Sequence, residues 1–216
     1  MFPLRKGLSE FIKLCLDEFP ELTVGDFFID GAVCDRLIEL HRACDRRGLV
    51  KRGRMGKGGH LVVDTEKKDS YDVVVDTLPP ELADEYGLDH YYAELQRCVQ
   101  LYTEQHPLLK QVGLFRVTES PAIQHYRPGG GFKMPHFERS NYANTTRMLV
   151  WMTYLNDLTD GGGTHFVYQK HTFEAKRGRT LIWPSDFTHT HAGVVSPSQH
   201  KYIITGWLNY VPQSTA

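Results

Sequence analysis

From Pro107 onward the chain alternates short β-type stretches with turn sequences, and this pattern limits the folds available to it. The expected strands are 113–117, 122–126, 132–137, 146–155, 165–168, 172–175, 179–183, 191–195 and 201–210. Turns rich in Gly, Pro and Ser separate them at 127–131, 160–163, 176–178, 184–186 and 196–198. Many short strands joined by regular turns indicate a β-sandwich or a jelly roll.

The first 110 residues are of a different, mainly helical kind. Apolar residues recur at helical spacing over 8–19 and 30–47, and 81–106 reads as a long helix with a break near Gly87. Short strands are expected at 60–64 and 71–75. The sequence therefore predicts an α+β fold in a single domain, 1–216, in which 1–110 supports a β core at 111–212.

The charges nearly balance, since 25 Lys and Arg residues face 26 Asp and Glu residues. This balance gives no reason to expect nucleic acid or an anionic membrane as the main partner. No apolar run is long enough to span a bilayer, and the first 19 residues are amphipathic, unlike a signal peptide. None of the four cysteines forms a C-x-x-C pair. We expect buried free thiols and a cytoplasmic protein.

A potential metal site is formed by His136 and Glu138, with His191 53 positions after Glu138. Residues i and i+2 of an extended segment point to the same side, so the first two can share a ligand. Two imidazoles and one carboxylate bind one face of an octahedral iron(II) ion and leave the other face open. His189 is an alternative third metal ligand, but the residues that follow His191 favour His191.

Lys201 begins an apolar strand on which Lys201, Ile203 and Thr205 share one face. A lysine on a buried face needs an anionic partner. The glycine runs at 129–131 and 161–163 lack the G-K-[ST] ending of a phosphate-binding loop and are expected to be hairpin turns. The charged segment 52–75 is either a flap over the site or a surface turn.

Several linked motifs lie in order between Ala122 and Tyr210: QHYRPGGGFKMPHFE, RMLVWMTYLND, GGGTHF, KRGRTLIWP, HAG and KYIITGWLNY. In this order the chain resembles the iron(II)- and 2-oxoglutarate-dependent dioxygenases, in the branch that contains the prolyl 4-hydroxylases. The resemblance implies a double-stranded β-helix (jelly roll) core with helices packed outside it. The segments upstream of Ala122 that would recognise a substrate do not align.

The resemblance also implies roles for individual residues. His136, Glu138 and His191 would hold the metal, with Glu138 where this branch usually has Asp. A carboxylate at the position of Glu138 argues against a halogenase, in which this third ligand is absent and chloride takes its place on the metal. A second group would line the 2-oxoglutarate site, namely Lys201, Tyr154, Tyr126, Thr205 and Trp207. Arg139 and His189 would contact the substrate or support the ligands.

The implied reaction is hydroxylation of a C–H bond with Fe(II), 2-oxoglutarate and O2, and with ascorbate as an optional addition. The substrate is either a prolyl residue in a peptide or protein, or a free amino acid or other small molecule. Two alternatives remain open, namely a metal-binding jelly roll without turnover and an interaction module that works through its helices.

Overall fold

The computed structural model describes residues 23–57 and 60–212. Its main sheet has eight antiparallel strands in the order β1-β11-β8-β13-β7-β5-β2, with β6 also paired to β13. The bounds are β1 Gly25–Phe28, β2 Lys51–Arg52, β5 Tyr71–Val74, β6 Phe115–Arg116, β7 Ala122–Tyr126, β8 Arg147–Tyr154, β11 Arg179–Pro184 and β13 Lys201–Tyr210.

A second, three-stranded sheet faces the main one and completes the jelly roll. It consists of β10 (His171–Phe173), β9 (Thr164–Phe166) and β12 (His191–Gly193), all antiparallel. A separate hairpin is made by β3 (Met55–Lys57) and β4 (His60–Val62). The predicted sheet-rich α+β fold is confirmed, and β1, β2 and β5 show that the first 110 residues also contribute to the main sheet.

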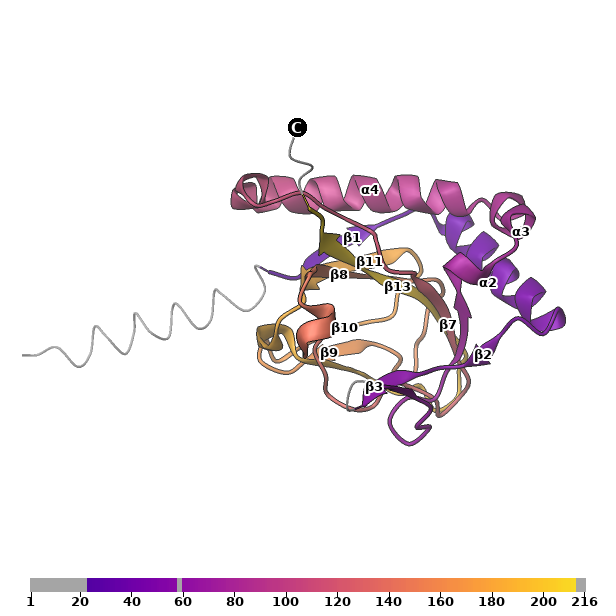
Figure 1. Ribbon diagram of the computed structural model, residues 1–216. Helices are drawn as coiled ribbons and strands as arrows, with labels where there is room; N and C mark the ends of the chain where they lie inside the picture. Colours follow the sequence, from indigo (N-terminus) through magenta and orange to yellow (C-terminus); the bar gives the residue numbers. More distant parts are fainter. Residues whose placement is uncertain (1–22, 58–59, 213–216) are drawn as a thin grey trace, which may run out of the picture.

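Three helices pack on the outer face of the main sheet (Figure 1). They are α2 (Gly31–Arg46), α3 (Pro80–Glu85) and α4 (Leu88–Gln105). The side chain of Asp30 accepts a hydrogen bond from the Ala32 amide and starts α2. Gly87 has a φ of +67° and separates α3 from α4, as the sequence predicted. No described helix is long and apolar enough to cross a membrane.

Alternate residues of β8 serve two hydrophobic cores on opposite faces of the main sheet. Trp151 packs toward the helices, with Leu37 and Tyr91 among its neighbours in that cluster. Val150 and Met152 point inward to a second cluster with Phe166 of the smaller sheet. This period-2 alternation leaves the space between the two sheets available for a pocket.

The predicted strand at 132–137 is wrong. Only two isolated bridges occur there, Lys68 to Phe132 and His136 to His191. Pro135 has no amide N–H to donate, which explains why a continuous ladder does not form. Four short 3-10 turns complete the described part: η1 Val75–Thr77, η2 Pro107–Gln111, η3 Tyr142–Asn144 and η4 Phe187–His189. The helix predicted at 8–19 lies outside the described residues.

Candidate metal centre and its pocket

The backbone brings the three predicted ligands together. His136 and Glu138 lie on the segment between β7 and β8, and His191 opens β12. The amide of each histidine donates to the carbonyl of the other at 2.9 Å. The Glu138 amide donates to the Ser185 carbonyl at 3.1 Å. Main-chain contacts therefore fix all three side chains on one small surface.

Their donor atoms have the spacing of ligands that share an ion. Glu138 Oε1 lies 3.4 Å from His136 Nε2 and 3.7 Å from His191 Nε2. One atom from each residue lies within 4.8 Å of the other two. Ligands about 2.1 Å from a metal and at right angles to each other are about 3 Å apart. The set therefore suits one divalent ion.

The other ring nitrogen of each histidine is bound to a backbone carbonyl. His136 Nδ1 donates to Met134 O at 2.9 Å, and His191 Nδ1 donates to His189 O at 2.8 Å. Because a carbonyl only accepts, each Nδ1 carries the proton and each Nε2 presents its lone pair. Metal-ligating histidines are oriented in this way.

The charge states also fit a cation. Burial by itself would raise the pKa of Glu138, but the hydrogen bond and charge of His136, with His191 and Arg147, lower that pKa to about 2. Burial, with the neighbouring His136, lowers the pKa of His191 to about 4. At neutral pH the carboxylate is ionised and His191 is neutral, which are the forms that bind a metal.

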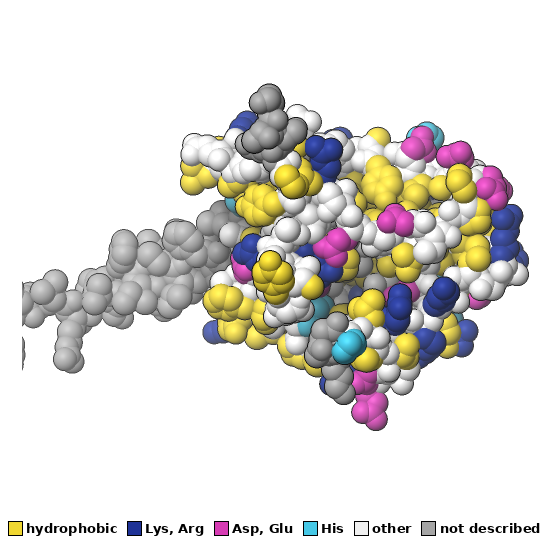
Figure 2. Space-filling model, in the orientation of Figure 1, with side chains coloured by type: hydrophobic (Ala, Val, Ile, Leu, Met, Phe, Trp, Pro, Cys, Tyr) yellow, Lys and Arg dark blue, Asp and Glu magenta, His cyan; other side chains and the backbone are white. Residues whose placement is uncertain are grey.

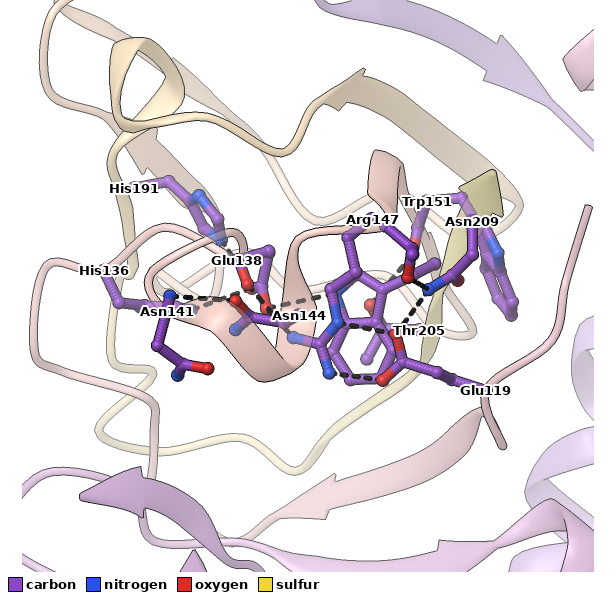
Figure 3. A network of polar contacts seen from close by, with 12 residues as sticks. Glu119, His136, Glu138, Asn141, Asn144, Arg147, Trp151, His191, Thr205 and Asn209 are labelled. Carbon is purple, nitrogen blue, oxygen red and sulfur yellow. Dashed lines mark hydrogen bonds and ion pairs between the residues drawn. The ribbon is translucent and has the colours of Figure 1, made fainter. Parts of the chain in front are cut away.

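The other carboxylate oxygen, Glu138 Oε2, contacts side chains of the protein and does not face the two histidines (Figure 3). The Trp207 indole donates to Oε2 at 3.0 Å, and Arg147 Nη1 lies 3.5 Å from it. Arg147 also donates to the Glu138 carbonyl at 3.1 Å, and its guanidinium carbon stands 3.6 Å from the centre of the Trp207 ring. These contacts leave Oε1 directed at the histidines.

Arg147 is fixed in turn by residues whose role sequence reasoning missed. Its Nε donates to Glu119 Oε1 at 2.8 Å, and its Nη2 contacts Glu119 Oε2. Asn209 Nδ2 donates to the same Glu119 Oε1 at 2.7 Å. A signal for Arg147 was available, because this charged residue opens an apolar strand within one of the motifs quoted above.

A pocket of about 870 Å³ lies beside the three ligands. Lys201, Thr205 and Trp207 of β13 line it, as does Tyr126 of β7, so these four face one cavity as predicted. Lys201 is 7% exposed and pairs with no carboxylate among residues 23–57 and 60–212. Burial lowers the pKa of its ammonium group to about 7. The pocket therefore contains a buried amino group that has no carboxylate partner among the described residues.

The Tyr126, Tyr154 and Thr205 hydroxyls already have partners. Tyr126 donates to Gln124 Oε1 at 2.6 Å, and Thr205 donates to the Trp151 carbonyl at 2.8 Å. The Tyr154 hydroxyl is 2.6 Å from Thr164 Oγ1. Tyr154 lies behind the pocket wall, which Thr164 lines, with its ring centre 5.2 Å from Lys201 Nζ. Direct contact of these hydroxyls with 2-oxoglutarate stays a prediction.

Arg139 and His189 do not line the pocket. Arg139 forms a two-pronged ion pair with Asp186. The ring of His189 contacts Thr23 at 2.7 Å and Thr188 at 3.0 Å, and its carbonyl supports His191. His191, and not His189, is therefore the histidine that meets His136 and Glu138.

Comparison with known proteins agrees with this geometry. Residues 121–209 match the family model of the 2OG-Fe(II) oxygenase superfamily. A Pseudomonas putida prolyl-4-hydroxylase structure has 18% identity and a TM-score of 0.64, and the match covers 92% of this chain and 99% of that one. A 2OG complex of a viral collagen prolyl hydroxylase from Paramecium Bursaria Chlorella virus-1 has 18% identity and a TM-score of 0.57. That match covers 88% of this chain and 97% of the viral one.

A prolyl hydroxylase from Trichoplax adhaerens, in complex with a hypoxia inducible factor peptide fragment, has 15% identity and a TM-score of 0.67. That match covers 94% of this chain and 92% of the other. At these identities the likeness shows a shared fold. No curated protein matches the chain.

Proposed function

We propose that this chain, whose residues 121–209 match the 2OG-Fe(II) oxygenase superfamily, is a 2-oxoglutarate-dependent dioxygenase that hydroxylates prolyl residues in peptides or proteins. Enzymes of this class use Fe(II), 2-oxoglutarate and O2, and ascorbate is an optional addition for this chain.

We assign the iron to His136, Glu138 and His191. The observation that carries this assignment is the meeting of two free Nε2 lone pairs and one free carboxylate oxygen within 4.8 Å. When bound there, iron supplies the oxidative chemistry that couples decarboxylation of 2-oxoglutarate to hydroxylation of a C–H bond. The protein side chains hold the metal, orient the reactants and exclude water.

Lys201 is proposed to bind the carboxylate of 2-oxoglutarate that is remote from the metal. Its buried ammonium group would gain the anionic partner that it otherwise lacks. The rings of Tyr126 and Tyr154, 5.6 and 5.2 Å from Lys201 Nζ, enclose this end of the pocket. Their apolar faces limit the water that competes for the ion pair.

A peptide suits the pocket better than free proline. A cavity of about 870 Å³ is at the upper end of the range for drug-sized ligands, so a free amino acid would leave most of the wall without contacts. The Trichoplax adhaerens enzyme, with the same fold, is in complex with a peptide fragment. A free amino acid or another small molecule is the alternative substrate.

The domain organisation, the location and the partners of the protein are also proposed. A single domain over 1–216 is supported by β1, β2 and β5, which join the sheet that β7, β8, β11 and β13 build. A cytoplasmic location fits the buried, free thiols of Cys34, Cys44 and Cys98. Neither nucleic acid nor a membrane is expected as the main partner.

Product analysis by mass tests the substrate class. The metal-loaded protein is incubated with 2-oxoglutarate, O2 and either capped peptides with one prolyl residue or free amino acids. We expect succinate release and one added oxygen atom with peptides. Turnover of free amino acids alone would contradict the peptide assignment but leave the dioxygenase intact.

A further inference from the structure

Basic residues are concentrated in one segment beside the pocket. Between Arg46 and Val63 the sequence has six Lys and Arg residues and no Asp or Glu, although the whole chain has a net charge of -1. The six are Arg46, Arg47, Lys51, Arg52, Arg54 and Lys57. This basic strip, residues 46–57, runs from the end of α2 through β2 to β3. Lys and Arg side chains gather on the corresponding side of the molecule (Figure 2).

Arg54 is the member of the basic strip that reaches the pocket. It lines the pocket wall and is exposed, and no carboxylate within the described ranges forms an ion pair with it. The other described Arg on that wall, Arg147, is already neutralised by Glu119. Arg54 is therefore an exposed cation on the pocket wall that has no carboxylate partner in the described part of the chain.

The backbone at Arg54 is firmly held. Lys68 Nζ donates to the Arg54 carbonyl at 3.3 Å and to Asp72 Oδ2 at 3.0 Å, and Lys68 is 6% exposed. The Gly53 amide donates to Ser70 O at 2.8 Å. A Cβ on Gly53 would lie only 2.0 Å from Ser70 Oγ, so a larger residue there would displace the Ser70 hydroxyl. A buried ion pair and a tight contact thus fix the place from which Arg54 acts.

The strip is poorly suited to nucleic acid. Binding of single strands combines basic residues with open aromatic faces on which bases stack. Tyr71, the aromatic residue beside the strip, is covered by Arg52 at 4.4 Å and by Arg127 at 4.2 Å from its ring centre. Within the strip, Arg52 already pairs with a carboxylate, that of Asp69 at 2.7 Å, which is the kind of partner that suits the remaining cations.

We infer that the basic strip binds acidic side chains of the peptide substrate, and that Arg54 pairs with a carboxylate close to the hydroxylated residue. This inference rests on the proposed peptide hydroxylase function. Electrostatic attraction of this kind acts mainly on encounter and binding, so it changes KM more than kcat. This attraction weakens as the salt concentration rises, because salt screens the charges.

Two capped peptides test the inference, alike in length and single proline but with flanking Glu in one and flanking Lys in the other. With the wild type we expect KM for the Glu peptide to be about tenfold lower at low salt, with similar kcat. Arg54→Glu should reverse the preference, and faster use of the Lys peptide by this variant also shows that it folds. Arg54→Gln should abolish most of the preference.

Lys110→Glu on η2 is the matched control, since Lys110 is exposed and lies outside the pocket, and it should keep the wild-type preference. Calorimetric binding of both peptides to the Mn(II)-loaded protein gives a readout independent of turnover. Peptide turnover without a charge preference would overturn the acidic-substrate inference alone. Turnover of free amino acids without peptide turnover or binding would overturn the peptide function as well.

Discussion

Glu138 has one more methylene than the Asp usual in the prolyl 4-hydroxylases that the chain resembles, and its neighbours restrain the longer side chain. Trp207 and Arg147 hold Oε2, so that only Oε1 faces the histidines. We predict that Trp207→Phe weakens Mn(II) or Fe(II) binding about tenfold, because it removes the hydrogen bond that orients a ligand. Metal titration by calorimetry measures this.

Trp151→Phe is the control for that prediction. The Trp151 indole N–H is buried and has no hydrogen-bond partner within the described part of the chain, so its loss should leave metal affinity unchanged. An equal loss of metal affinity in both variants would show that general packing, and not the bond to Glu138, is responsible.

Lys201 should make 2-oxoglutarate binding depend on pH. Burial lowers its pKa to about 7, and only the protonated form attracts a carboxylate. The apparent Kd for 2-oxoglutarate is therefore expected to rise about tenfold from pH 6 to pH 8. Lys201→Arg keeps its charge throughout and should remove most of this rise. A pH-independent Kd in the wild type would contradict the assignment.

Removing the charge from Lys201 gives a further prediction. Lys201→Ala should weaken 2-oxoglutarate binding by about a hundredfold, because it removes a buried charge partner, and should hardly alter metal affinity. Both constants are measured by titrating the anaerobic protein. Equal losses for metal and 2-oxoglutarate would indicate a collapsed site.

At the scale of residues, the sequence predicted groups that lie on regular strands or in short motifs. His136, Glu138 and His191 meet as expected, and Lys201, Thr205 and Trp207 share a pocket because they are spaced by even numbers on β13. The Arg147, Glu119 and Asn209 contacts join segments far apart in sequence. No local pattern reports such pairings, so they needed the folded chain.

At the scale of elements, α2 depends on its first residue. Asp30 accepts the Ala32 amide at 2.8 Å, and α2 packs in the helix-side core against the sheet. Asp30→Ala should lower the free energy of unfolding by about 1 kcal/mol, whereas Asp30→Asn should keep most of it, because Asn also caps helices. Urea denaturation measures both, and equal losses would contradict the cap.

Three short strands at the start of the described part, β1, β2 and β3, were not predicted from the sequence. The helix 30–47 and the break at Gly87 were predicted within about one residue, since apolar periodicity marks the helix and the glycine itself marks the break. The strands β1, β2 and β3 are too short for a period to be read. β1 and β2 form by pairing with the longer strands β11 and β5, whereas β3 pairs with β4 in a separate hairpin.

At the scale of the whole molecule, the buried His41 and the half-buried His125 couple stability to pH. His41 of α2 and His125 of β7 lie 5.5 Å apart between ring centres, where helix meets sheet. Burial lowers the pKa of His41, and burial with nearby His41 and His200 lowers that of His125 from 6.5 to about 4. The unfolded chain thus binds protons first as pH falls, so stability is lost between about pH 6.5 and 4.

We therefore expect a lower Tm at pH 5 than at pH 7 for the metal-free protein, and a smaller drop in His125→Gln. Replacement of the exposed His90 by Gln should leave the drop unchanged. Thermal unfolding followed by circular dichroism measures all three proteins. An identical drop in Tm in His125→Gln and the wild type would show that His125 does not contribute to the loss of stability at low pH.

The central claim is that His136, Glu138 and His191 hold the iron that couples 2-oxoglutarate to hydroxylation. The most direct measurement counts succinate and hydroxylated peptide together, by mass, for the wild type and His191→Ala with Fe(II) and O2. We predict equal amounts of both products from the wild type, none without 2-oxoglutarate, and neither product from His191→Ala. Wild-type product from His191→Ala, or hydroxylation without 2-oxoglutarate, would contradict the account.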